Sequence, residues 1–468
     1  MASKQYHIMM FPWLAFGHMI PFLELSKRLA AKGALISFVS TTKNLQRLPL
    51  IPSNLQPRIN LVELPLPRVE GLPENCEATV DLQENQIQFL KTAYDLLAHP
   101  LENLIQVDVP DLILFDFASD WIPEIGAKFG VPTGFFVVFT AAAFAFIGPP
   151  EELKTSNRRP SPEHFTVPPD WIPFPSLLAA SPDYATILWS SIHKPDATGV
   201  STGQRMAKSI EDCSLVAFRS CDEFEGEYLA VVRELYQKPV LPIGVLPPVP
   251  EENKKEREVD SNWSDTFEWL DGQKAKPVVF VGFGSEYKMP IEQIHELAFA
   301  IELSRLPFVW ILRKPQEVHS SDLLPPGFAY RTSSQGIVIQ GWAPQLEILA
   351  HSAIGACLFH SGWGTIIESL GFGHPLILLP MINDQGLNAK LMVEKEVGYE
   401  VPRNEDGSFS REIVARSMRV VAVAPEGEKL RSKAAEMRRI FNNQQSEERY
   451  INKLMEHLEK DGYSKGKN

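Results

Sequence analysis

The sequence predicts an α/β protein built from two doubly wound domains that face each other across a cleft. Along the chain, two series of short apolar runs alternate with amphipathic stretches, a pattern typical of parallel βαβ units. The two series are similar in size, and the 468 residues are about three times the usual length of a single domain. A segment rich in proline and charge separates the series, and residues 246–260 are the predicted interdomain linker.

The first series occupies residues 1–245. Its first forty residues alternate an apolar run, an amphipathic stretch and a β-rich run, which predicts strand, helix and strand. Proline is dense from Gly148 to Pro182, so an irregular loop is expected there. Strands are predicted over residues 7–13, 35–40, 59–64, 111–115, 131–138 and 214–218, and helices over 19–31, 86–97 and 224–236.

The second series occupies residues 261–445. In open α/β sheets, ligands bind outside the carboxyl ends of the strands, so small-molecule sites are expected at those ends, facing the cleft. Strands are predicted over residues 278–281, 307–312, 336–340, 354–359 and 376–379, helices over 291–303 and 387–396, and closing amphipathic stretches over 411–423, 426–441 and 446–460.

The net charge indicates which binding partners the protein suits, and the cysteines indicate its redox compartment. The formal charge of −13 makes nucleic acid and a membrane surface poor candidates as partners. Four scattered cysteines without a Cys-x-x-Cys pair predict packed thiols in a reducing compartment rather than disulfides or zinc ligands. The apolar start of the chain is short and broken by Pro12, Gly17 and Pro21, unlike a signal peptide or a membrane span. A cytoplasmic protein is expected, and we take it to be a monomer.

Glycine turns mark places where backbone N–H groups at the start of a helix can face phosphate. None of the Gly-x-Gly elements completes Gly-x-Gly-x-x-Gly, and no Walker A sequence occurs. The sequence therefore lacks the motifs that identify dinucleotide-dependent dehydrogenases and P-loop NTPases. One turn, Phe359 to Thr365, lies between an apolar strand and an apparent helix and suits a diphosphate. A tight connection that needs glycine only for its backbone angles explains the same residues equally well.

The 44-residue segment from Trp342 to Gln385 changes that balance, because it resembles the signature box of plant family-1 UDP-glycosyltransferases without a gap. Other segments also resemble this family: PWLAFGHMIPFLELSKRLA at 12–30, PRVEGLPE at 67–74, WLDGQ at 269–273 and the Gly284-Ser285 pair. Within the family, the chain most resembles the branch that adds a sugar to an existing glycoside of a terpenoid or flavonoid.

The resemblance implies a fold, an activity and a co-substrate. The family fold is GT-B, with two Rossmann-like domains, which agrees with the two series. It implies that residues 446–468 form a helix that returns to the first domain. The activity implied is transfer of a sugar from a UDP-sugar to a small hydrophobic acceptor, with no cofactor beyond the donor.

The box also implies how the nucleoside is held. Trp342 would stack under uracil and the backbone of Ala343 would contact the base edge, while Gln345 and Glu368 would bind the ribose hydroxyls. Taken singly, each residue has an ordinary structural explanation: Trp342 would suit a core and Glu368 a helix surface.

The same resemblance assigns the diphosphate to the glycine turn. His360, Thr365, the backbone of Gly364 and the hydroxyl of Ser285 would hold it at the helix N-terminus. Where the family usually has His-Cys-Gly-Trp-Asn-Ser, this chain has His-Ser-Gly-Trp-Gly-Thr, so Gly364 removes an asparagine amide that often donates to phosphate. Backbone donors must then compensate, or donor affinity will be weaker.

Three residues near the end of the box would contact the donor sugar: Trp363, Asp384 and Gln385. The Asp384-Gln385 ending resembles members that prefer glucose, although users of UDP-rhamnose or UDP-xylose share it. For Asp384 alone, a helix N-cap is the structural alternative.

Transfer from a nucleotide sugar needs a base for the acceptor hydroxyl, and His18 is the candidate. It lies at the junction of the first strand and first helix, where the positive end of the helix dipole disfavours an imidazolium. Asp116 directly follows an apolar strand and is the expected carboxylate partner, as the resemblance also implies. Asp120 is its rival, although we expect it to cap the next helix. A hydrogen-bonded turn residue is the structural alternative for His18.

The reaction expected is a single displacement that inverts the donor's anomeric centre. No Asp-x-Asp pair occurs in the sequence, and the helix dipole, His360 and hydroxyls can meet the phosphate charge, so a metal ion is not required. A nucleotide-sugar epimerase or hydrolase and a non-catalytic UDP-sugar-binding protein are the alternatives. The presence of both His18 and Asp116 argues against the binding protein.

The acceptor is expected to be a bulky hydrophobic plant natural product or its glycoside, of terpenoid (steviol-type) or flavonoid class. No charged residue occurs from Gly134 to Pro150. Most aromatic residues of the first domain are ordinary core. Those that could line an acceptor pocket are Phe117, Phe139, Phe144, Phe146, Trp171 and Trp189.

Overall fold

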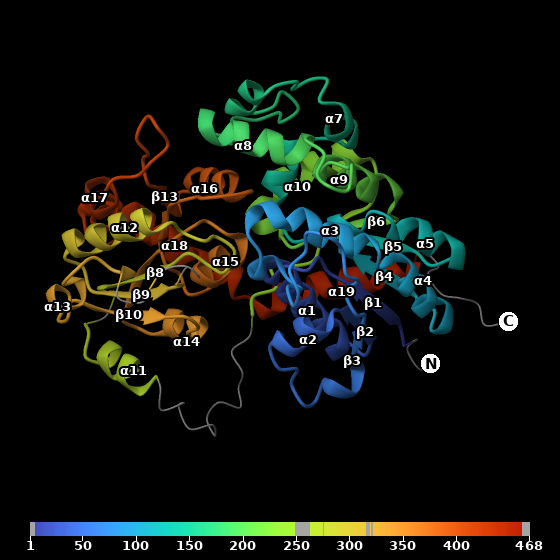
Figure 1. The fold of residues 1–468 in the computed structure, drawn as a ribbon, viewed down its shortest axis with the longest axis horizontal. Helices are drawn as coiled ribbons and strands as arrows, with labels where there is room; N and C mark the ends of the chain where they lie inside the picture. Colours follow the sequence, from blue (N-terminus) through green and yellow to red (C-terminus); the bar gives the residue numbers. More distant parts are fainter. Residues whose placement is uncertain (1–4, 249–262, 275, 315–318, 320–321, 461–468) are drawn as a thin grey trace. The chain divides into compact units, whose positions relative to one another are not determined.

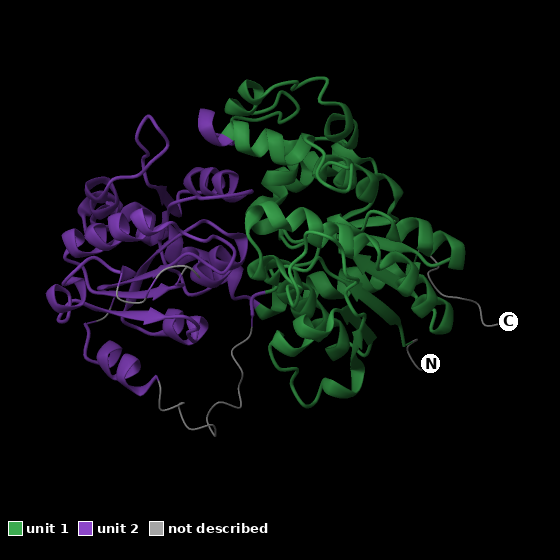
Figure 2. Cartoon of the chain, in the orientation of Figure 1, with its two compact units in different colours: residues 1–175, 185–246, 444–468 green, residues 176–184, 247–443 purple. Residues whose placement is uncertain are grey.

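The computed structural model describes residues 5–248, 263–274, 276–314, 319 and 322–460, and the chain divides into two compact units. Unit 1 comprises Met1–Pro175, Ala185–Leu246 and Gln444–Asn468, and unit 2 comprises Ser176–Tyr184 and Pro247–Asn443 (Figure 2). Most of the predicted linker, from residue 249 to residue 260, lies outside the described residues.

Unit 1 is built on a seven-stranded parallel sheet in the order β3-β2-β1-β4-β5-β6-β7 (Figure 1). The chain winds outward from β1 in one direction and from β4 in the other, so the switch point lies between these two neighbours. The strands are short, mostly buried and rich in apolar residues, as parallel strands covered on both faces require. Their bounds are β1 (His7–Phe11), β2 (Leu35–Ser40), β3 (Ile59–Glu63), β4 (Leu112–Phe115), β5 (Thr133–Val137), β6 (Leu215–Phe218) and β7 (Val240–Pro242).

Helices of unit 1 follow the strands. The loop predicted from Gly148 to Pro182 is wrong in part, because a helix and a 3-10 turn form there, each with proline in its first turn, where no N–H is needed. The helices are α1 (Phe16–Ala31), α2 (Thr42–Arg47), α3 (Ile87–Asp95), α4 (Ala98–Val107), α5 (Ile122–Phe129), α6 (Ala141–Ile147), α7 (Pro150–Thr155), α8 (Pro182–His193, which begins in unit 2), α9 (Thr202–Asp212), α10 (Asp222–Tyr236) and α19 (Gln444–Lys460), with 3-10 turns η1 (Gln56–Arg58), η2 (Thr79–Asp81), η3 (Glu84–Gln86), η4 (Phe117–Ser119) and η5 (Pro162–Thr166).

Unit 2 repeats the plan with a six-stranded parallel sheet in the order β10-β9-β8-β11-β12-β13, and its switch point lies between β8 and β11. Its strands are β8 (Val278–Gly282), β9 (Phe308–Leu312), β10 (Gly336–Gln340), β11 (Ile354–Phe359), β12 (Leu376–Leu378) and β13 (Gly398–Glu400). Its helices are α11 (Ser264–Asp271), α12 (Ile291–Ser304), α13 (Phe328–Arg331), α14 (Gln345–Ala350), α15 (Trp363–Gly371), α16 (Gln385–Glu394), α17 (Arg411–Ala422) and α18 (Glu428–Phe441), with a 3-10 turn η8 (Pro425–Gly427).

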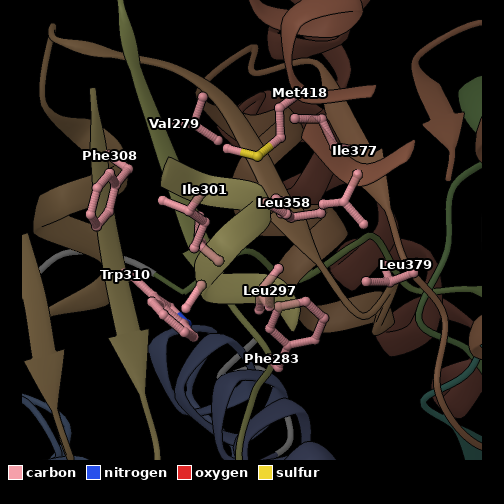
Figure 3. Close-up of a cluster of buried hydrophobic side chains, with 14 of the residues drawn as sticks. Val279, Phe283, Leu297, Ile301, Phe308, Trp310, Leu358, Ile377, Leu379 and Met418 are labelled. Atoms are coloured by element: carbon pink, nitrogen blue, oxygen red, sulfur yellow. The ribbon is translucent and has the colours of Figure 1, made fainter. Parts of the chain in front are cut away.

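The core of unit 2 shows how the alternation of strand side chains fixes a helix on the sheet. Phe308 and Trp310, two residues apart on β9, point to the same face and pack with Leu297 and Ile301 of α12 (Figure 3). All four are buried, and each apolar side chain so buried contributes about 1.5–3 kcal/mol. The same cluster includes Val279, Leu358, Ile377 and Met418.

The C-terminal helix α19 is part of unit 1 and is fixed there by a buried carboxylate. Leu454 and Leu458 of α19 join the core beside the strands of unit 1. Glu447 is 2% exposed, and it accepts hydrogen bonds from the backbone N–H groups of Val245 (2.9 Å) and Leu246 (3.0 Å). Burial raises the pKa of Glu447. Among the helices of the described residues, none combines the length and the apolar character that crossing a bilayer demands.

Replacing Glu447 with alanine is expected to lower the free energy of unfolding by about 2–4 kcal/mol, because two buried N–H groups lose their acceptor. Urea unfolding followed by circular dichroism measures the change. Glu448→Ala is the matched control, since the neighbouring Glu448 is exposed and forms an ion pair with Lys32 at the surface. Equal losses for the two variants would contradict the anchoring role of Glu447.

Candidate active site

The centre of unit 1's candidate site is a hydrogen-bonded pair, His18 and Asp116. β1 and β4 are adjacent and parallel, with Phe11 opposite Phe115, so the residues that follow them emerge at the same edge of the sheet. His18 lies in the first turn of α1 and Asp116 directly follows β4. His18 Nδ1 and Asp116 Oδ2 are 2.8 Å apart. The two residues are 98 positions apart in the chain, and the order of the strands brings them together.

Asp116 is held as an acceptor by three donors. Its Oδ1 accepts from the backbone N–H of Phe117 (2.8 Å), and its Oδ2 accepts from that of Trp13 (3.2 Å) as well as from His18. The residue is 1% exposed, so these bonds take the place of water. Because the carboxylate accepts a hydrogen bond from Nδ1–H, it fixes the tautomer of the neutral imidazole: the proton is on Nδ1 and the lone pair is on Nε2. The imidazole is therefore arranged to accept a proton at Nε2.

Asp120, the rival carboxylate, is engaged elsewhere. Its Oδ1 accepts from Arg205 Nη1 at 2.7 Å. Burial raises the pKa of Asp120, while the charge of Arg205 opposes this effect. The expected cap is wrong: α5 begins at Ile122 with Trp121 as its N-cap, while Asp120 is the C-cap of the preceding η4 turn. In unit 1, Asp116 is therefore the carboxylate on His18.

The glycine turn of unit 2 is shaped around an imidazole. His360 directly follows β11, and Gly362 is the N-cap of α15. A Cβ on Gly362 would lie 2.6 Å from His360 Nε2, and one on Gly284, whose φ is +67°, would lie 2.7 Å from His360 Cε1. Glycine is required at both places because the ring occupies the space of a side chain. Burial lowers the pKa of His360 to about 4, so the imidazole is neutral near pH 7.

The start of α15 presents backbone donors. The first N–H bonded within the helix is that of Ile366, which donates to the carbonyl of Gly362 (3.0 Å). The N–H groups of Trp363, Gly364 and Thr365 precede it and have no carbonyl one turn earlier in the helix. The Trp363 indole is buried and packs edge-on against Phe441, with the ring centroids 6.0 Å apart. Because the side chain is engaged in this packing, the backbone is the part of Trp363 available at the start of α15. Thr365 is half-buried.

Ser285 joins this group through the neighbouring strand. It follows Gly284 at the end of β8, and β8 pairs with β11, which carries His360. The close approach of Gly284 to the imidazole therefore brings Ser285, half-buried, to the same edge of the sheet. The predicted diphosphate residues thus come from two adjacent strand ends.

Trp342 and the Gln345–Glu368 pair form a second part of the unit 2 site. Trp342 is 68% exposed, so the core alternative for it is wrong. Its ring meets Trp263 edge-on at 6.0 Å. Gln345 Nε2 donates to Glu368 Oε2 at 2.6 Å, which joins the start of α14 to α15. Glu368 is half-buried and bonded rather than a free surface charge, and Ala343 is buried beside Trp342.

The Asp384-Gln385 pair begins α16. Asp384 occupies the N-cap position but makes no capping hydrogen bond; its Oδ2 accepts from Asn388 Nδ2 at 2.7 Å. Gln385 Oε1 accepts from the N–H groups of Met381 and Ile382, both at 2.9 Å. The side chains of the pair are thereby fixed by the loop and helix that surround them.

Sequence reasoning missed two residues that support this pair. Asn388 also donates to the carbonyl of Ser361 at 3.1 Å, which ties α16 to the glycine turn. Its position one helical turn after Asp384 was a usable signal. Tyr184 packs on Gly386, whose N–H lies 3.4 Å from the phenol oxygen. The sequence carries no signal for that contact, because Tyr184 is about two hundred positions away.

The predicted acceptor aromatics divide into two groups. Phe117 and Phe139 flank the His18 ring, with centroids at 5.7 and 5.3 Å, and Phe144 packs behind Phe139. The others surround the buried Arg159 instead: its guanidinium lies over the rings of Phe146 and Trp171, and its carbonyl accepts from Trp189.

Sequence comparison shows which family of proteins this chain is related to. The family model described as UDP-glucoronosyl and UDP-glucosyl transferase matches residues 255–415. UDP-glycosyltransferase 91C1 of Arabidopsis thaliana is 42% identical over 98% of this chain and 97% of its own. UDP-glycosyltransferase 91D1 of Stevia rebaudiana is also 42% identical, over 98% and 93%. Soyasaponin III rhamnosyltransferase of Glycine max is 39% identical, over 98% and 96%.

Solved structures share the fold. UGT89C1 of Arabidopsis thaliana in complex with UDP-L-rhamnose superposes with a TM-score of 0.75 at 24% identity, over 97% of this chain and all of the other. UGT71G1 of Medicago truncatula in complex with UDP-glucose gives a TM-score of 0.75 at 22% identity, over 98% and 99%. Both structures are plant UDP-glycosyltransferases, which agrees with the two parallel-sheet units described above.

The predicted fold and enzyme class are thereby confirmed. The chain belongs to the plant family-1 UDP-glycosyltransferases, enzymes of the GT-B fold that transfer a sugar from a UDP-sugar to a plant natural product.

Proposed function

We propose that the protein is an inverting UDP-glucosyltransferase that acts on a hydroxyl of a hydrophobic terpenoid or flavonoid, or of its glycoside, with His18 as general base. The observation that carries this proposal is the 2.8 Å contact between His18 Nδ1 and a buried Asp116 that accepts two further backbone N–H groups. A base that is oriented by a hydrogen-bonded carboxyl group is the arrangement that this chemistry needs.

In the proposed reaction, His18 Nε2 takes the proton of the acceptor hydroxyl as that oxygen attacks the anomeric carbon. Asp116 keeps the lone pair on Nε2 and offsets the charge of the imidazolium that forms. A single displacement on an α-linked UDP-sugar gives a β-linkage.

The donor is proposed to bind in unit 2. The uracil stacks on the exposed face of Trp342, beside Ala343, and the bonded pair Gln345–Glu368 accepts and donates to the ribose hydroxyls. An exposed indole offers a flat apolar face on which a base can stack.

The diphosphate is proposed to lie at the start of α15. Thr365, Ser285 and a neutral His360 supply donors, and the positive end of the α15 dipole faces the negative charge, so that no metal ion is needed. The backbone N–H of Gly364 stands in for the asparagine amide that the family usually has there. Trp363, Asp384 and Gln385 are proposed to contact the sugar, Trp363 through its backbone.

UDP-rhamnose is the second candidate donor, because relatives at 39% and 32% identity are named as rhamnosyltransferases. The Asp384-Gln385 ending favours glucose, and UDP-xylose remains a third possibility of the same type. A glycoside as acceptor is supported by a relative named anthocyanidin-3-O-glucoside rhamnosyltransferase, from Petunia hybrida. The apolar rings of Phe117 and Phe139 around His18 suit a hydrophobic acceptor. We also propose that the protein is a cytoplasmic monomer and that its two domains span residues 1–245 and 261–445.

Incubation with UDP-glucose, UDP-rhamnose or UDP-xylose and a panel of plant glycosides, followed by mass spectrometry, tests the function. The expected result is a hexose added from UDP-glucose to a hydrophobic acceptor, with a β-linkage in the NMR coupling constants of the product. A deoxyhexose added only from UDP-rhamnose would establish the second candidate instead. An α-linkage, donor conversion without an acceptor product, or reaction only with small hydrophilic acceptors would contradict the proposal.

His18→Ala is expected to reduce kcat by about 10²- to 10⁴-fold, the usual contribution of a general base, while the Kd for UDP stays unchanged. Steady-state kinetics and calorimetry with UDP measure the two quantities. His7→Gln is the matched control, since His7 lies at the opposite end of β1 and bonds Ser37. An unchanged kcat in His18→Ala shows that His18 is not the base.

Gly362→Ala is expected to weaken UDP binding about 5- to 100-fold, because the new methyl group overlaps His360 and displaces either the ring or the start of α15. Calorimetry with UDP measures the affinity. Gly226→Ala, where a Cβ meets no atom closer than 4.0 Å, controls for the substitution itself. Equal affinity in Gly362→Ala and the wild type would remove the turn from the binding site.

A further inference from the structure

We propose that Arg205 is a positioning residue for the reaction: it holds the turn that carries Asp116 and thereby aims the His18–Asp116 pair. This inference rests on the proposed function, in which that pair activates the acceptor. Arg205 lies on α9, which packs against the η4 turn that follows Asp116. It is 3% exposed, so its charge is satisfied by the protein rather than by water.

The guanidinium joins three separate segments of unit 1. Its Nη1 donates to the carbonyl of Ala118 (3.0 Å) and to Asp120 Oδ1 (2.7 Å), both in the η4 region. Nη1 also donates to Asp95 Oδ1 (2.9 Å), and Nη2 donates to Asp95 Oδ2 (2.6 Å) and to Thr198 Oγ1 (3.0 Å). Arg205 therefore binds the turn after β4 to the end of α3.

The η4 turn depends on such a support. It is three residues long, and its internal bonds are those of Ser119, whose N–H and hydroxyl both donate to the carbonyl of Asp116 (3.1 and 3.0 Å). A turn of that length fixes its own shape weakly. The N–H of Phe117 donates to Asp116 Oδ1, so a shift of η4 moves the carboxylate itself. The contact of Arg205 with the carbonyl of Ala118 holds the middle of this turn.

The end of α3 also holds the other segment that touches Asp116. Tyr94, next to Asp95, donates its hydroxyl to the carbonyl of Pro12 at 2.9 Å. The next residue, Trp13, donates its N–H to Asp116 Oδ2. The two backbone N–H groups that donate to Asp116 are therefore both connected to the end of α3. The segment of Trp13 is connected through Tyr94, and the segment of Phe117 is connected through Arg205 and Asp95.

Arg205 also engages two other carboxylates near this turn. The guanidinium binds both oxygens of Asp95 and Oδ1 of Asp120. A lysine cannot do this, because its single ammonium lacks the planar fork that reaches several acceptors at fixed angles. The role thus requires the shape of arginine as well as its charge.

The test compares Arg205→Lys and Arg205→Ala in the full-length enzyme, with UDP-glucose and an acceptor found in the panel. We expect kcat to fall about 10- to 100-fold in both variants, the effect of misplacing a catalytic group by about an ångström, with KM for the UDP-sugar within about threefold of the wild type. Guanidinium ion added to Arg205→Ala at non-denaturing concentration should restore part of kcat, and ammonium should not. Rates are normalised to the fraction of protein that binds UDP by calorimetry.

Lys208→Met is the matched control. Lys208 lies one turn further along α9 and approaches the same Asp120 at 3.9 Å, but it is more exposed and its closer partner is Glu124 (2.7 Å). We expect a normal kcat in this variant, because removing a charge near Asp120 leaves the η4 turn supported.

A normalised kcat of Arg205→Lys within twofold of the wild type would overturn the inference. So would a loss in Arg205→Ala that guanidinium leaves unchanged while UDP binding is normal, or an equal loss in Lys208→Met. Failure of the proposed function has a different signature, since His18→Ala then keeps its activity. An inactive His18→Ala together with a fully active Arg205→Lys would refute the positioning role alone.

Discussion

The pairing of β1 with β4 is the constraint on which unit 1's candidate site depends. These strands are far apart in the sequence, yet Phe11 lies opposite Phe115, so the two chain segments leave the sheet side by side. His18 then meets Asp116 at 2.8 Å, and the buried carboxylate is held by backbone N–H groups from both segments. Doubly wound sheets create such a meeting point wherever the winding direction reverses.

Unit 2 has the same doubly wound topology, and its candidate site also lies where two strands of opposite winding direction are neighbours. The proposed diphosphate site needs concentrated donors without an excess of side-chain bulk, and the pairing of β8 with β11 places two glycine-containing turns around one imidazole. The ring fills the space that Cβ atoms at Gly284 and Gly362 would take, and burial keeps it neutral. The sequence departures from the family at Ser361 and Gly364 fall in this turn.

Several polar residues act by holding others in place. Asn388 connects Asp384 with the glycine turn, Gln385 fixes the loop before α16, and Arg205 braces the turn after Asp116. Each of these side chains makes several hydrogen bonds in a buried setting, which limits the positions that it can adopt.

The sequence by itself determined the alternation of strands and helices, the fold class and the family box, because apolar periodicity and glycine turns are local properties of the chain. It also placed His18 and Asp116 at strand ends. It mistook Asp120 for a helix cap, missed α7 in the proline-rich segment, and had no signal for Arg205 or Tyr184. Only the tertiary structure decided those points, because the order of strands and the partners of buried charges depend on contacts between residues remote in sequence.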